Sequence, residues 1–141
     1  MNSRIDIITL AVDDLERALH FYRRVFRTDA GEILGTEYLE DDKNAAGAIA
    51  LFEVEGGPFL SLYPRAQLAK DAHVKASAAK TGDFSLGHFV AAKDEVDAWI
   101  GRARDAGGTI TEDPRDRPWG IYSAYFKDLD GHLWEIIWRH S

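Results

Sequence analysis

Residues 4 to 26 read RIDIITLAVDDLERALHFYRRVF, a stretch in which an isoleucine-rich run gives way to apolar residues at helical spacing. The run that ends at Val12 predicts a β-strand, because β-branched residues favour extended backbone. Asp13 is a candidate helix N-cap, and Glu16 follows it at the spacing of a capping box. The stretch therefore predicts a strand followed at once by an amphipathic helix.

A second stretch repeats this order of strand, acidic cap and helix. It spans residues 86 to 108 and reads LGHFVAAKDEVDAWIGRARDAGG, with Asp94 as its candidate cap. A constant offset of 81 residues aligns Asp13 with Asp94 and Leu15 with Val96. An internal repeat is the simplest interpretation of this match.

Three shorter apolar runs follow each predicted helix and predict strands. They are GEILG (31–35), AAGAIALFEV (45–54) and PFLSLYP (58–64), then GTITE (108–112), GIYSAYFK (120–127) and HLWEIIW (132–138). The polar segment 65–83 predicts a connecting helix or loop. We therefore expect a single α+β domain over residues 1–141. It should contain two βαβββ modules, at 4–64 and 84–138, which together form a cupped mixed sheet.

The composition of the chain restricts which partners, metal sites and cellular locations we expect for it. The 141 residues are 45% hydrophobic and carry a formal net charge of −7, with no basic stripe. We therefore expect no nucleic acid and no membrane as partner. The sequence has no cysteine, which excludes disulfides and thiolate metal sites. The first residues lack the apolar run of a signal peptide, so we expect a cytoplasmic protein.

The stretch DLDGHLWEIIW, residues 128 to 138, places one carboxylate, Glu135, in an otherwise apolar strand. Burial of a carboxylate is costly unless a metal, a proton or a cationic group pairs with it. The repeat sets Ile7 against His88 and Ser61 against Glu135. Because side chains alternate along a strand, we expect His88 and Glu135 to face the cup and Phe89 to face the helix.

Three motifs together resemble the glyoxalase/bleomycin resistance/dioxygenase superfamily, also called the vicinal oxygen chelate superfamily, over essentially the whole chain. They are the first strand with DDLERALHFY, then GHFVAAKDEVDAWI, and YFKDLDGHLWE. The resemblance implies paired βαβββ modules, often in a dimer. It also implies one divalent ion, held at the positions of Ile7, Ser61, His88 and Glu135. Ile7 has no donor atom and Ser61 is a poor ligand, so only His88 and Glu135 remain as metal candidates.

Aromatic residues supply a different kind of candidate site. The stretch RPWGIYS (117–123) resembles the corresponding part of bleomycin-binding members, and aromatic rings can stack on a planar ligand. The alternative for Trp119 is that it covers a sheet edge or a dimer contact, and for His88 and Glu135 that they form a structural pair. The candidate ligand-binding residues are Phe59, Ser61, Tyr63, His88, Trp119, Tyr122 and Tyr125.

Two functions are compatible with these patterns. The first is binding of a small aromatic or amphipathic organic molecule in the cup, with no certain cofactor. The alternative is a metal-dependent lyase or isomerase of the glyoxalase I kind, rather than an extradiol dioxygenase. In it a weakly bound Zn, Ni, Fe or Mn ion would polarise a carbonyl and Glu135 would be the catalytic residue. For either function we expect a homodimer as the assembled state.

Overall fold

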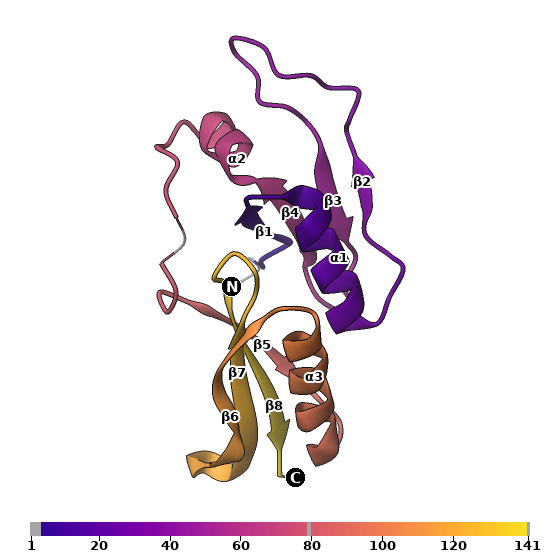
Figure 1. Cartoon of the computed structure of the whole chain (residues 1–141), viewed down its shortest axis with the longest axis vertical. Coiled ribbons are helices and arrows are strands. Elements are labelled where there is room, and N and C mark those ends of the chain that lie inside the picture. The colour runs from indigo at the N-terminus through magenta and orange to yellow at the C-terminus, as the bar shows by residue number, and fades with distance from the viewer. Residues whose placement is uncertain (1–3, 79, 141) are drawn as a thin grey trace. The chain divides into compact units, whose positions relative to one another are not determined.

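The computed structural model describes residues 4–78 and 80–140. This part of the chain divides into two compact units. One contains the residues up to 23 together with 28–78, and the other contains residues 24–27 together with those from 80 on. Each unit holds one four-stranded sheet (Figure 1). We refer to these units as the first and second modules.

The first module is built on a sheet with strand order β1-β4-β3-β2, in which only the β1–β4 pair is parallel. Its elements are β1 (Ile7–Val12), α1 (Leu15–Phe26, whose last three residues group with the second unit), β2 (Glu32–Leu34), β3 (Ile49–Phe52), β4 (Phe59–Pro64) and α2 (Arg65–Ala72). Helix α1 covers one face of the sheet (Figure 1), and its Tyr22 ring lies 6.4 Å from Phe52 of β3. The strand residues buried on this face are Leu10, Val12, Ala50, Phe52, Leu60 and Leu62.

The second module repeats this arrangement with strand order β5-β8-β7-β6, in which β5 and β8 are parallel. Its elements are β5 (Ser85–Phe89), α3 (Lys93–Asp105), β6 (Thr109–Arg117), the 3-10 turn η1 (Pro118–Gly120), β7 (Ile121–Lys127) and β8 (Leu133–Arg139). Helix α3 packs against β6, β7 and β8. The core between helix and sheet contains Val96, Ile100, Ala103, Ala124, Phe126, Trp134 and Ile136.

The predicted order of strand, helix and three strands is confirmed in both halves, and the fold is α+β with two four-stranded mixed sheets. Residues 65–72 of the predicted connecting segment form α2. Within the described residues, no helix combines the length and apolar character needed to cross a bilayer.

The predicted offset between the repeats is wrong by three residues. Strands β1 and β5 begin at Ile7 and Ser85, and helices α1 and α3 begin at Leu15 and Lys93. Both pairs of starting points give an offset of 78 residues instead of 81. The predicted cap Asp94 fails with the same alignment, because Ala92 is the N-cap of α3 and Asp94 lies inside its first turn.

The corrected offset changes the partner of His88 in the repeat. His88 is equivalent to Leu10, which is buried under α1, and not to Ile7. The strand pairs support this equivalence, because Leu10 lies opposite Leu62 and His88 lies opposite Ile136, and both partners are fully buried. The side chain of His88 is therefore directed to the helix-covered face of its sheet.

Candidate functional site

Glu135 has neighbours on both sides across the second sheet. Gly87 of β5 lies opposite Glu135 in the parallel pair, and Tyr125 of β7 lies opposite it in the antiparallel pair. Residues that lie opposite one another in paired strands project from the same side of a sheet. We call this side, which points away from α3 and carries Gly87, Tyr125 and Glu135, the Glu135 face.

Two hydroxyl groups supply the partners that Glu135 requires. The Oγ atom of Ser123 donates a hydrogen bond of 2.8 Å to Oε2 of Glu135, and Ser123 is fully buried. The hydroxyl of Tyr125 also hydrogen-bonds the carboxylate. Burial, followed by this hydrogen bond and the charge of Glu135, raises the pKa of Tyr125 above its usual value. The carboxylate is thus held by hydroxyl donors on the neighbouring strand.

Arg117, the last residue of β6, lies next to this cluster. Its Cζ atom is 5.2 Å from the centre of the Tyr125 ring, a distance at which a guanidinium is attracted to the ring face. Its Nε and Nη2 atoms are buried, and no hydrogen-bond acceptor among the described residues reaches them. Each unmet buried donor costs about 1–3 kcal/mol. Arg117 therefore carries two buried donors whose hydrogen-bonding capacity is unused.

His88 does not meet Glu135, and the predicted pairing of these residues is wrong. The ring of His88 lies 4.8 Å from that of Trp99 on α3, on the opposite side of the sheet from Glu135. Its partial burial there lowers the pKa of His88, although the charge of Glu95 acts in the opposite direction. Phe89, which was expected to face the helix, lies on the Glu135 face instead.

Of the aromatic candidates in the second module, only Tyr125 lies on the Glu135 face. Tyr122 faces α3, where its hydroxyl donates a 2.9 Å hydrogen bond to Asp97 and Lys93 lies over its ring. Trp119 occupies the turn η1 with a left-handed φ of 69° and is 91% exposed. Tyr122, a predicted ligand-binding residue, therefore lies on the opposite side of the sheet from Glu135, and Trp119 is an exposed aromatic residue of the turn.

Phe59, Ser61 and Tyr63 alternate along β4 and share the side of the first sheet that points away from α1. Ser61 is fully buried, and its Oγ atom donates a 2.6 Å hydrogen bond to Oγ1 of Thr9 on the neighbouring strand. Phe59 is 41% exposed. We call this side of the first sheet the Ser61 face.

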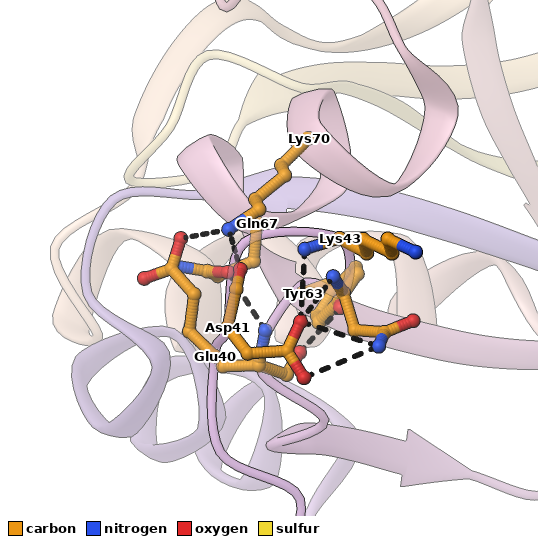
Figure 2. Close-up of polar contacts among 8 residues, drawn as sticks. Glu40, Asp41, Lys43, Tyr63, Gln67 and Lys70 are labelled. Atoms are coloured by element: carbon orange, nitrogen blue, oxygen red, sulfur yellow. Dashed lines mark hydrogen bonds and ion pairs between the residues drawn. The ribbon is translucent and has the colours of Figure 1, made fainter.

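The hydroxyl of Tyr63 is already engaged by the loop between β2 and β3, because it donates to the carbonyl of Ala46 (Figure 2). The same loop is fastened to α2. The backbone N–H of Ala46 donates to Gln67, and Nζ of Lys70 donates to a Glu40 oxygen 2.9 Å away. The hydrogen bond from Lys70 lowers the pKa of Glu40. Tyr63 thus helps to hold this loop in place.

The residues do not fit the divalent ion that the superfamily implies. Ile7 offers only hydrocarbon, the Ser61 hydroxyl is committed to Thr9, and His88 lies on the opposite side of its sheet from Glu135. Over residues 4–78 and 80–140, no three histidine or acidic side chains come together as an ion would require. The donor set of this chain therefore does not match a metal-assisted step.

A shallow groove adjoins the cluster around Glu135. Its volume is about 510 Å³, within the range of small-molecule sites. Tyr125 lines it together with residues from the segment that leads into β5, from the first position of β5, from β6 and from β8. These other lining residues are Gly82, Phe84, Ser85, Thr111, Glu112 and Leu133. The groove thus combines aromatic surface with hydroxyl and carboxylate groups.

The sequence interpretation missed Ser123 and Arg117. A signal for Ser123 was present, because it is two residues from Tyr125 in a predicted strand and must share its face. The signal for Arg117 was weaker. The predicted strand at 108–112 stopped short of this residue, whereas β6 extends through it to the turn. Two register shifts interrupt its pairing with β7, and the sequence pattern does not reveal them.

The family of the chain follows from a comparison with known families. The family model for the Glyoxalase/Bleomycin resistance protein/Dioxygenase superfamily matches residues 4–136. The match spans nearly the whole chain, and the chain belongs to this superfamily. No match was found among curated proteins.

Solved structures agree with this assignment. The chain is similar to a glyoxalase-related enzyme from Fulvimarina pelagi, with 26% identity, a TM-score of 0.77 and coverage of 96% of this chain and 88% of the other. It is also similar to a lactoylglutathione lyase from Agrobacterium tumefaciens, with 25% identity, a TM-score of 0.63 and coverage of 98% and 95%. The fosfomycin resistance protein FosX from Listeria monocytogenes shares the fold at 21% identity, with a TM-score of 0.69 and coverage of 99% and 96%.

Proposed function

We propose that this chain binds a small aromatic or amphipathic organic molecule on the Glu135 face of the second module. The observation that carries the proposal is the convergence of the Ser123 and Tyr125 hydroxyls on the Glu135 carboxylate, beside the groove of about 510 Å³. Ligand sites typically combine an apolar wall with a few oriented polar groups.

The groove supplies both kinds of contact. Phe84, Tyr125 and Leu133 form its apolar part, and Ser85, Thr111 and Glu112 its polar part. Glu135 accepts hydrogen bonds but cannot donate them when ionised, so a ligand group beside it would be an O–H or N–H donor. A molecule with an aromatic body and a polar edge would satisfy both parts of the groove.

The Ser61 face of the first module carries apolar surface of its own. Phe59 and Ile7 on that face are 41% and 50% exposed, so both keep apolar surface for a ligand. The alternative function, a metal-dependent lyase or isomerase, has less support, because the ligand set described above does not fit the ion. We therefore favour binding over metal-assisted catalysis.

The proposal is tested by titrating the protein with a panel of small aromatic compounds and following backbone amide NMR shifts. The matched variants are Tyr125→Ala and Tyr122→Ala, because these tyrosines lie on opposite faces of the same strand. Loss of a stacking ring should weaken binding about tenfold for Tyr125→Ala. Tyr122→Ala should leave affinity unchanged. Equal affinity of the Tyr125 variant, or shifts confined to the α3 side, would refute the proposal.

A further inference from the structure

Basic residues outnumber acidic ones on the Glu135 face, although the whole chain has a net charge of −7. Among residues that strand pairing places on this face, the basic ones are Arg115, Arg117, Lys127 and Arg139, and the acidic ones are Glu112 and Glu135. An excess of positive charge on one face of an acidic protein favours an anionic ligand there.

The arginines of this face differ in what they already contact. Nε of Arg115 lies 3.1 Å from a carboxylate oxygen of Glu112, and the guanidinium of Arg139 lies 4.4 Å from the centre of the Phe89 ring. Arg117 stacks on Tyr125, but its Nε and Nη2 atoms have no acceptor among the described residues. Arg117 therefore differs from the other two in that its unmet donors are buried, where they carry a desolvation cost that an acceptor would relieve.

We infer that Arg117 binds an oxyanion of the ligand, so that the molecule taken by the second module is an organic acid. This inference rests on the proposed function and specifies its ligand class. Nε and Nη2 form one edge of the guanidinium, and this edge matches two oxygens of a carboxylate, phosphonate or phosphate. A ligand bound in this way would place its apolar body near Tyr125, which lines the groove.

A ligand could reach the Nε–Nη2 edge of Arg117 after a change of side-chain rotamer, without a change in the fold. Arg117 as a whole is only partly buried, and it is the last residue of β6, next to the turn η1. Both atoms are buried beside the Tyr125 ring, so binding of an anion would require the side chain to change rotamer and turn the Nε–Nη2 edge outward. The unmet donors favour this rotation once an acceptor is present.

The inference is tested with three probes of similar size: benzoate, phenylphosphonate and the neutral benzyl alcohol. Wild-type protein should bind both anions more tightly than the alcohol. Arg117→Met should weaken the anions tenfold to a hundredfold, as expected for loss of charge-assisted hydrogen bonds. The same change should leave the alcohol unaffected. Arg115→Met, on the same strand and face, serves as the control and should change anion binding less than Arg117→Met.

The outcomes separate the two proposals. If no probe binds the wild-type protein, the proposed function fails and this inference fails with it. If benzyl alcohol binds as tightly as the anions, or Arg117→Met binds them unchanged, the ligand class is wrong while the site stands. Thermal unfolding gives an independent readout. Arg117→Met should unfold no earlier than wild type, and a marked loss of stability would show that water satisfies these donors in a structural role.

Discussion

Gly87 lies directly opposite Glu135 in the parallel pair of β5 and β8, on the same side of the sheet. His88, one residue further along, projects to the other side and packs on Trp99. A histidine one position earlier would therefore stand beside the carboxylate. With histidine at position 88 the Glu135 face presents one metal donor, Glu135, and with histidine at position 87 it would present two.

This relationship predicts that Gly87→His creates a weak site for Zn²⁺ or Ni²⁺ with Glu135. The site has room, because the nearest atom to an added Cβ is Cδ1 of Ile137 at 3.7 Å, an ordinary contact. The added imidazole should raise metal affinity about tenfold over wild type. Isothermal titration calorimetry measures this, with His88→Leu as the control. A loss of metal binding in His88→Leu, with no gain in Gly87→His, would contradict the register.

His88 should titrate below its usual pKa of about 6.5, because its packing against Trp99 disfavours the charged ring. Above about pH 6.5 the ring of such a histidine is mostly neutral in both the folded and the unfolded state, so it does not lower the free energy of unfolding. Stability should then fall as the pH drops from this value through the folded pKa. NMR titration of the ring protons measures the midpoint. Trp99→Ala should move it toward 6.5, and Glu95→Gln should lower it further.

The loop between β2 and β3 should loosen when Asp41 is replaced by alanine. Oδ1 of Asp41 accepts hydrogen bonds of 2.9 and 2.8 Å from the backbone N–H groups of Lys43 and Asn44 (Figure 2), and these bonds lower its pKa. We expect the amides of Lys43 and Asn44 to exchange hydrogen about tenfold faster in Asp41→Ala. The neighbouring change Asp42→Ala is the control and should leave exchange unaltered. Unchanged protection in Asp41→Ala would show that the fastening to α2 alone holds the loop.

We also predict a homodimer in solution. The two sheets end in edge strands, β1 and β2 in one and β5 and β6 in the other, and unpaired edges favour association. Several large apolar side chains, among them Ile7, Phe59 and Phe89, are at least 41% exposed. Light scattering after size exclusion should give twice the mass of one chain at micromolar concentration. A monomer mass over this range would refute the prediction.

The sequence by itself determined the order of the elements and the existence of the repeat. Alternation in the strands and helical spacing in residues 15–26 and 93–105 are local properties, so each half could be assigned without knowledge of the other. The lone carboxylate at Glu135 was also a valid signal, because its burial required partners that the structure supplies as Ser123 and Tyr125.

Only the tertiary structure decided which residues stand beside Glu135. An alignment error of three residues is nearly one turn of a helix, so the wrong offset still matched the apolar faces of α1 and α3. In a strand, an odd shift moves every side chain to the opposite face. The same error therefore left the helices correctly predicted and placed His88 on the wrong side of its sheet. Strand pairing across β5, β8 and β7 fixes the face of each residue, and no local sequence pattern contains that information.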